Sequence, residues 1–223
     1  MSSQIVSGIQ PRVVLRELKK LYRPPRSFLE WDTPLDLLVA TVLSARCTDA
    51  QVNRVTPVLF ARCRTVSDYL ELPRKELERL IHSCGTFHSK ATYIHALSGK
   101  IQNNHRGVVP RTMEELTALP GVGRKTACIV LYGAFGLNEG IAVDTHVFRM
   151  ARRLGLSRGK TPEKVEQDLM KLFPRTEWGR INALFISHGR AVCTGQRRKC
   201  EQCVFRKECP SSLTMRKGDL ASK

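Results

Sequence analysis

Residues 119–131 read LPGVGRKTACIVL. The glycines at 121 and 123, next to a proline, permit a backbone path closed to other residues, so the stretch predicts a tight turn between two helices. The free N–H groups of such a turn, and the positive end of the helix that follows it, would attract an anion such as phosphate. The predicted phosphate contacts are Gly121, Val122, Gly123 and Arg124. An ordinary turn between packed helices is the alternative, because Pro-Gly turns are common.

Lys125 would lie in the first turn of the helix after this hairpin. The positive helix end disfavours its ammonium form, and a free amine is a nucleophile. Ile129 and Tyr132 follow at four and seven residues, so we expect Lys125 to head an inward-facing side of the helix. A surface lysine, or one paired with a phosphate, is the alternative.

Asp144 follows the apolar residues Ile141-Ala142-Val143 and precedes the helical stretch THVFRMARRLGL. It is well placed as an N-cap, and that structural role alone would explain it. Beside a lysine in a cleft, its carboxylate would also accept a proton or stabilise a cationic sugar transition state. His146 and His188 are interpreted as packed, hydrogen-bonded residues, and neither is assigned a chemical step.

Four of the eight cysteines crowd into 17 residues near the end of the chain, with 6, 2 and 5 residues between them. They are Cys193, Cys200, Cys203 and Cys209. Four sulfur ligands suit tetrahedral zinc or a cubane iron–sulfur cluster, but zinc sites usually join two Cys-x2-Cys pairs and only one is present. Between the first two cysteines lie Arg197, Arg198 and Lys199, which are predicted to contact phosphate. A solvated charge run is the alternative.

The composition favours a polyanionic partner. Lysine and arginine number 37 against 20 acidic residues, a net charge of +17, so nucleic acid is the first candidate and an anionic membrane the second. No apolar run approaches the ~20 residues of a membrane span, and no signal peptide pattern is visible, so we expect a cytoplasmic protein, nucleoid-associated if prokaryotic. Cysteines outside the cluster are interpreted as small buried residues rather than disulfide partners.

Helical periodicity dominates the chain and alternating strand patterns are nearly absent, which predicts an all-α fold of about ten helices. Helices are predicted at 34–45, after a cap at Thr48 or Asp49, after Pro73, at 89–103, 113–119 and 124–135, and from Thr161-Pro162. The stretch SSLTMRKGDLASK at the end is expected to be a frayed tail.

Three motifs, in order, resemble the endonuclease III family of DNA glycosylases. They are LPGVGRKTACIVL at 119–131, VDTHVFRMARRLGL at 143–156 and the cysteine spacing of 6, 2 and 5; in addition, LLVATVLSARCTDAQVNRV at 37–55 resembles the family's early helix pair. The resemblance covers almost all of the chain. It implies a two-lobed helix-hairpin-helix fold, with a six-helix barrel over 28–137, an iron–sulfur domain from 1–27 and 138–223, and DNA across the cleft between the lobes.

The same resemblance implies that Lys125 is a catalytic lysine, that Asp144 is a catalytic aspartate, and that the four cysteines hold a structural 4Fe-4S cluster. It implies a base-excision-repair enzyme, acting as a monomer on double-stranded DNA with damaged bases or abasic sites. Such an enzyme removes damaged, mainly oxidised, pyrimidines. It then cuts the strand on the 3′ side by β-elimination through a lysine Schiff base.

Two positions depart from the family pattern. Arg46 stands where glutamine is usual, and Thr86 stands where a bulky aliphatic residue is usual. Both belong to loops that fill the gap left by the flipped base, and Phe87 next door is a candidate substitute for the missing wedge. A glycosylase specialised for mismatches or pyrimidine dimers, and a non-catalytic cluster-bearing DNA-binding module, are the alternative functions.

Overall fold

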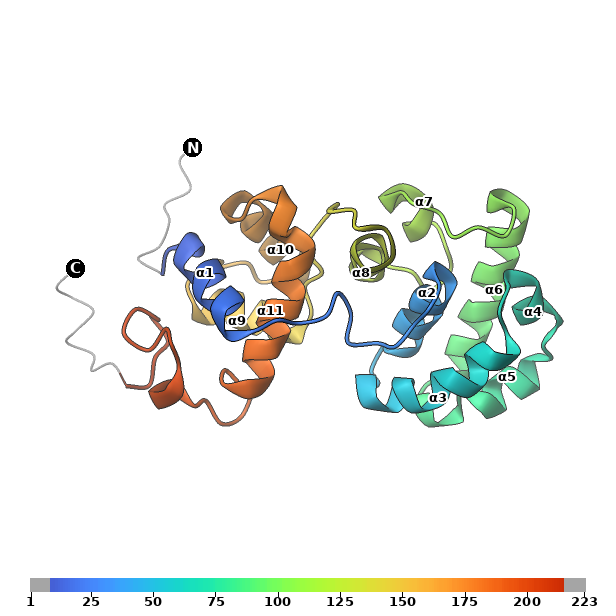
Figure 1. Cartoon of the computed structure of the whole chain (residues 1–223), viewed down its shortest axis with the longest axis horizontal. Helices are drawn as coiled ribbons and strands as arrows, with labels where there is room; N and C mark the ends of the chain where they lie inside the picture. Colours follow the sequence, from blue (N-terminus) through green and yellow to red (C-terminus); the bar gives the residue numbers. More distant parts are fainter. Residues whose placement is uncertain (1–8, 215–223) are drawn as a thin grey trace. The chain divides into compact units, whose positions relative to one another are not determined.

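The computed structural model describes residues 9–214, which form α-helices, three short 3-10 helices and, within that range, no strand (Figure 1). The prediction of an all-α fold is therefore confirmed. A single isolated bridge joins Cys193 to Arg198. Most of the tail predicted from Ser211 lies outside the described residues.

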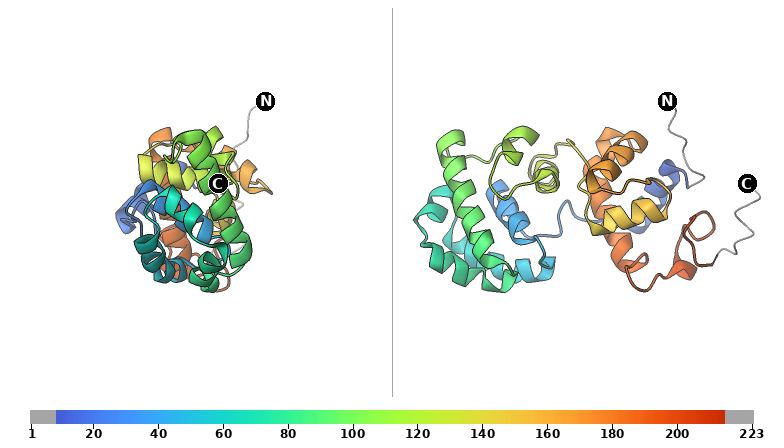
Figure 2. Two further views of the ribbon diagram at one scale, coloured as in Figure 1. Left: turned by 90° about the vertical axis from the view of Figure 1, so that its right-hand side faces the viewer. Right: turned by 180° about the vertical axis from the view of Figure 1, so that it is seen from behind.

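The chain divides into two compact units, each drawn from two further directions in Figure 2. One is Ser27–Glu139, and the other combines the residues up to Arg26 with those from Gly140 onward. Because the second unit is built from both ends of the chain, the first is an insertion within it.

The Ser27–Glu139 unit is organised around one apolar helix. Its elements are α2 (Pro34–Leu43), α3 (Asp49–Arg62), α4 (Val66–Glu71), α5 (Arg74–Leu80), η1 (His82–Cys84), α6 (Phe87–His105), α7 (Met113–Thr117) and α8 (Arg124–Phe135). Every residue of α2 after its first is buried, and α2 contacts α3, α6 and α8. A helix that is apolar all round can only be stable inside the core.

The start of α2 is fixed by a capping box. The Thr33 hydroxyl accepts the N–H of Asp36, and the Asp36 carboxylate accepts the N–H of Thr33. Its end comes at Leu43, two residues before the predicted end at 45, because the chain turns there into a left-handed conformation at Arg46. Helix α6 is longer than the predicted 89–103 by two residues at each end.

The second unit has its own core. Its elements are α1 (Pro11–Leu21), α9 (Thr145–Arg153), α10 (Pro162–Leu172), η2 (Arg175–Glu177), α11 (Trp178–Ala191) and η3 (Cys200–Gln202). Helix α11 packs against α1 and α9. Phe185 of α11 is fully buried among apolar residues of these three helices. This packing brings the first helix of the chain onto one of the last.

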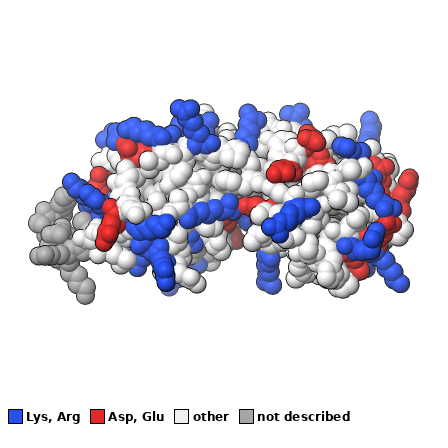
Figure 3. Space-filling view, turned by 60° about the horizontal axis from the view of Figure 1, so that its bottom comes forward, with Lys and Arg blue, Asp and Glu red and all other residues white. Residues whose placement is uncertain are grey.

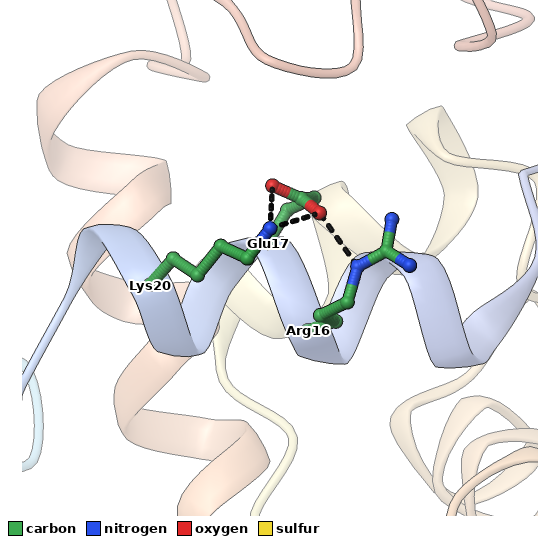
Figure 4. Close-up of polar contacts among 3 residues, drawn as sticks. All are labelled: Arg16, Glu17 and Lys20. Atoms are coloured by element: carbon green, nitrogen blue, oxygen red, sulfur yellow. Dashed lines mark hydrogen bonds and ion pairs between the residues drawn. The ribbon is translucent and has the colours of Figure 1, made fainter.

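Helix α1 is amphipathic. Val14 and Leu18 are fully buried, while Arg16 and Lys20 are exposed on either side of the Glu17 carboxylate (Figure 4). The Arg16 Nε lies 2.7 Å and the Lys20 Nζ 3.2 Å from Glu17 Oε1, and these hydrogen bonds lower the pKa of Glu17. Two of the cations of α1 are thus partly neutralised by their own helix.

Basic side chains are scattered over the face drawn in Figure 3 rather than gathered in one patch.

The described helices include none that is both long and apolar enough to cross a membrane.

Close packing of α8 on α2 makes Gly133 intolerant of a side chain. A Cβ at Gly133 would lie 2.5 Å from Cδ2 of Leu37, which is fully buried and would have to shift within the core. We expect Gly133→Ala to lower the free energy of unfolding by about 1–3 kcal/mol. At Gly99 of α6 the same Cβ would meet Leu70 at 3.9 Å, an ordinary contact. Gly99→Ala should therefore raise the free energy of unfolding by about 0.4–1 kcal/mol. If urea unfolding showed that both substitutions change this free energy in the same direction, this account would be contradicted.

Candidate functional site

The predicted hairpin lies between α7 and α8, and its turn is tightly packed. Gly121 has φ +76°, and a Cβ there would lie 2.7 Å from Cγ of Tyr93 on α6, so only glycine fits. The Val122 side chain is buried, and its N–H donates to the Leu119 carbonyl at 3.1 Å. The Lys100 ammonium of α6 donates to the carbonyl of Ala118 at 2.7 Å and fixes the end of α7. Helix α6 thus holds the hairpin at two points.

Helix α8 starts without a side-chain cap. Its N-cap is Gly123, which offers no oxygen to the first N–H groups, whereas α2, α3, α4, α7, α9 and α10 begin with a threonine or aspartate whose side chain accepts such an N–H. The Arg124 side chain is exposed, and one of its nitrogens donates to the Glu139 carbonyl at 3.4 Å. A helix start of this kind suits an external anion, which would accept the N–H groups and meet the positive end of the helix dipole.

Lys125 is exposed at the second position of α8, and Ile129 and Tyr132 are half-buried. The prediction that Lys125 heads an inward-facing side is therefore wrong. The buried side of α8 is formed by residues such as Ala127 and Val130, and Lys125 lies off that side in the first turn. Its amine faces solvent, where a molecule from outside can reach it.

Asp144 is half-buried at the N-cap of α9, where its Oδ1 accepts the N–H of Val147 at 2.8 Å. The predicted capping role is confirmed. Capping uses one carboxylate oxygen, and a carboxylate has a second one with which to accept a proton or face a cation. Asp144 belongs to the unit that resumes at Gly140, and Lys125 to the unit Ser27–Glu139.

The turns that carry Arg46 and Thr86 lie next to each other. A Cβ on Gly85 would lie 4.0 Å from the Arg46 carbonyl oxygen. Arg46 and Thr86 are exposed and both have left-handed backbone conformations, with φ +52° and +37°. Phe87 is half-buried; its ring centroid lies 4.6 Å from that of His82 and 4.1 Å from that of His88. The structure therefore presents these predicted contacts together at one exposed place.

The four clustered cysteines line a single pocket after α11. Burial raises the pKa of the Cys209 thiol to about 11, and the charges of Cys203, Cys193 and Cys200 raise it too, so these sulfurs lie close enough to interact. Across residues 9–214, no three His, Cys, Asp or Glu side chains converge as a single metal ion requires.

Arg153 at the end of α9 anchors the cysteine segment. It donates to the Thr194 carbonyl at 2.7 Å and to Cys193 Sγ at 3.3 Å. His188 of α11 is buried, and its Nε2 lies 3.5 Å from Cys203 Sγ while its Nδ1 lies 3.0 Å from the Tyr22 hydroxyl. His188 is thus the packed, hydrogen-bonded residue that the sequence predicted. Arg153 was not predicted, because only the fold brings the end of α9 to the cysteines.

The basic run in the cysteine segment is used in two ways. Arg197 and Lys199 are exposed, whereas the half-buried Arg198 donates to the Ser211 carbonyl at 2.9 Å. Arg198 therefore helps to close the segment, and the other two cations are the ones presented to solvent.

Residues 39–175 match the family model described as "HhH-GPD superfamily base excision DNA repair protein". The chain is 47% identical to endonuclease III of Synechocystis sp. over 89% of its length and 91% of that protein, and 45% identical to endonuclease III of Bacillus subtilis over 79% and 80%. It is also similar to a solved structure titled as a trapped endonuclease III–DNA covalent intermediate, with a TM-score of 0.86, 42% identity, and coverage of 90% of this chain and 94% of that one.

The capping role of Asp144 can be separated from any chemical role. Asp144→Ala removes the acceptor of the Val147 N–H and should lower the free energy of unfolding by about 1 kcal/mol. Asparagine caps about as well as aspartate, so Asp144→Asn should unfold at nearly the wild-type urea concentration. Equal destabilisation by both substitutions would mean that the carboxylate charge, rather than the cap, stabilises this helix start.

Proposed function

This chain belongs to the HhH-GPD superfamily of base excision DNA repair proteins and is a DNA glycosylase and abasic-site lyase of the endonuclease III type; we propose that Lys125 is its nucleophile and that Asp144 assists it. The observation that carries the proposal is that both residues lie within the matched segment 39–175, Lys125 in the turn after the hairpin and Asp144 at a helix start. Because the chain is an enzyme, the alternative of a non-catalytic, cluster-bearing DNA-binding module is excluded.

Double-stranded DNA that contains damaged bases or abasic sites is the proposed substrate. The uncapped start of α8 would accept a backbone phosphate at Gly121 and Gly123, with Arg124 adding charge. Arg197 and Lys199 are exposed and would meet a second phosphate, with Arg198 holding their segment. Phosphate contacts of this kind carry no base sequence, which suits an enzyme that must find lesions anywhere. We propose that it acts as a monomer, in the bacterial cytoplasm where the nucleoid lies.

The proposed reaction starts once the damaged nucleotide is out of the stack, because the sugar carbon C1′ is otherwise shielded. The Lys125 amine attacks C1′, and the bond to the base breaks with its electron pair leaving on the base. The nitrogen then forms a double bond to C1′ as the C1′–O4′ bond opens and O4′ takes up a proton. The resulting protonated imine acidifies the C2′ proton. Loss of that proton expels the 3′ phosphate by β-elimination, and hydrolysis of the imine returns the free amine. Only an amine can form this imine, and the solvent-facing position of Lys125 leaves it accessible to DNA.

Asp144 contributes charge to the same reaction. Positive charge develops on the sugar as the base departs, and a carboxylate nearby stabilises it and can accept the proton that Lys125 loses. Because Oδ1 is fixed by the Val147 N–H, the carboxylate has a defined orientation before substrate arrives.

The cysteine segment is proposed to hold a 4Fe-4S cluster through Cys193, Cys200, Cys203 and Cys209. Four cysteines line one pocket and include only one Cys-x2-Cys pair, whereas structural zinc usually joins two such pairs, so a cubane cluster is favoured over a single zinc. A bound cluster would supply a structural cross-link, and Arg153 and His188 would donate hydrogen bonds to its cysteines.

Lesion choice is proposed to lie in the turns of Arg46, Thr86 and Phe87, with oxidised pyrimidines as the main substrates. Arginine is suited to paired hydrogen bonds with guanine, so Arg46 would favour guanine opposite the lesion. Thr86 offers less apolar surface than a bulky aliphatic wedge, and Phe87, supported by His82 and His88, would fill part of the gap.

Lys125→Ala should abolish borohydride trapping of the protein on abasic-site DNA, because no amine remains to form the imine. DNA binding, measured by anisotropy, should persist. Lys75 occupies the same second position in α5 and is also exposed, so Lys75→Ala is a matched control that should trap like wild type. Undiminished trapping by Lys125→Ala would remove Lys125 from the role of nucleophile.

Asp144→Asn should fold normally, yet its rate of base removal should be lower than that of wild type by about 10²-fold or more.

Purified protein should contain roughly four iron atoms per chain if the four thiolates hold one cubane. Cys200→Ser should lose most of this iron and the associated colour, whereas Cys47→Ser, which changes a cysteine in the other unit, should keep both. Stoichiometric zinc in protein prepared without oxygen would defeat the cluster assignment.

A further inference from the structure

The two turns that bear Arg46 and Thr86 are held in an unfavourable conformation. Both residues have φ in the left-handed region, as does Gly85 at +59°, and a non-glycine residue there costs on the order of 1 kcal/mol. Both are exposed, so their own side chains do not anchor them in the core. Another contact in the fold must therefore hold the backbone of these two residues in this conformation.

Lys90 in the first turn of α6 is placed to do this. The residue is 3% exposed, and its ammonium donates to the carbonyl of Leu43 at 2.7 Å and to the carbonyl of Cys84. Leu43 is the last residue of α2, and Cys84 is the last residue of η1. One buried cation therefore joins the two segments that lead into the two turns.

The chemistry of this contact explains why a lysine can be buried there. The last carbonyls of a helix have no partner inside it and carry partial negative charge. Two such carbonyls face the ammonium from two helix ends, which offsets part of the cost of removing its charge from water. Burial nevertheless lowers the pKa of Lys90. Apolar packing of α6 onto the core, by Ile94, Leu97 and Ile101, is separate from this contact.

We propose that Lys90 is a positioning residue for base excision: by tying the ends of α2 and η1 together, it holds Arg46 and Thr86 in the conformations in which they replace the extruded nucleotide in the stack. This rests on the proposed function, which assigns Arg46 and Thr86 to the gap in the duplex. Lys90 itself touches no DNA in this role.

Excision of a base and cleavage at an abasic site depend on these turns to different degrees. Extruding a base costs stacking and pairing energy, which groups filling the gap must offset, and this cost is least where the base is already missing. Both reactions use the same amine and carboxylate. Loss of Lys90 should therefore slow excision selectively, whereas general damage to the fold would slow both reactions alike.

The test compares single-turnover rates of full-length, cluster-loaded protein on duplexes carrying thymine glycol or an abasic site. Lys90→Met keeps most of the length of the unbranched side chain and removes both hydrogen bonds. We expect its thymine-glycol excision to fall about 10- to 100-fold, as when a mutation away from the chemistry misplaces a group by about an ångström, and its abasic-site cleavage to change by less than about threefold. Lys90→Arg keeps donors for the two carbonyls and should recover part of the excision rate.

Lys100→Met is the matched control, because Lys100 lies on the same helix and donates to one carbonyl at the start of the hairpin. Since both substrates need the hairpin, this variant should slow both reactions by the same factor. Equal effects of Lys90→Met on the two substrates, in protein with wild-type circular dichroism, would overturn the proposal, as would no effect on either.

Two further sets of measurements distinguish a failure of this proposal from a failure of the proposed function. Wild-type activity and borohydride trapping test the function alone, whereas only the ratio of the two rates tests Lys90. Arg46→Gln and Thr86→Leu should also shift that ratio, and if Lys90→Met shifts it while neither of these does, Lys90 acts through something other than these turns. If Lys90→Met does not fold, the same ratio for Lys90→Gln, whose amide is too short to span both carbonyls, decides in the same way.

Discussion

Every α-helix leaves the N–H groups of its first turn and the carbonyls of its last turn without partners inside the helix. A chain of short helices, such as this one, has many such ends, and each must find an acceptor or a donor elsewhere. Most helix starts here are satisfied locally by a threonine or aspartate side chain. Three of the places assigned to function are helix ends where this local solution is absent, shared or given a second use.

At each of these three places the missing hydrogen-bond partner comes from a different source. At α8 the N-cap is Gly123, and the proposed partner is a phosphate from outside the chain. At α9 the cap is Asp144, whose carboxylate serves the helix with one oxygen and is proposed to serve the reaction with its charge. At the ends of α2 and η1 the partner is the buried ammonium of Lys90. The same electrostatic need thus orients three places that are proposed to bind phosphate, to assist the reaction and to recognise the lesion.

Local signals in the sequence predicted most of the helices, although no range was predicted for α1, α4 or α11. Thr33-Pro34 and Thr161-Pro162 predicted helix starts because capping and proline geometry act over three or four residues. Three features could not be predicted from the sequence. The outward position of Lys125 depends on which side of α8 meets α2, and the contacts of Lys90 and Arg153 join segments 47 and about 40 residues apart. A buried lysine looks the same in sequence as an exposed one until the carbonyls that surround it are known.

The discontinuous unit has a consequence for how the protein is made. Helix α1 leaves the ribosome before the other described helices, but its partners α9 and α11 are encoded after the whole of Ser27–Glu139. Domains generally fold as they emerge, so the inserted unit can complete its core while Val14 and Leu18 are still uncovered. Helix α1 must therefore wait for α11 before its apolar side is covered, and until then its exposed Arg16 and Lys20 keep the segment charged and solvated.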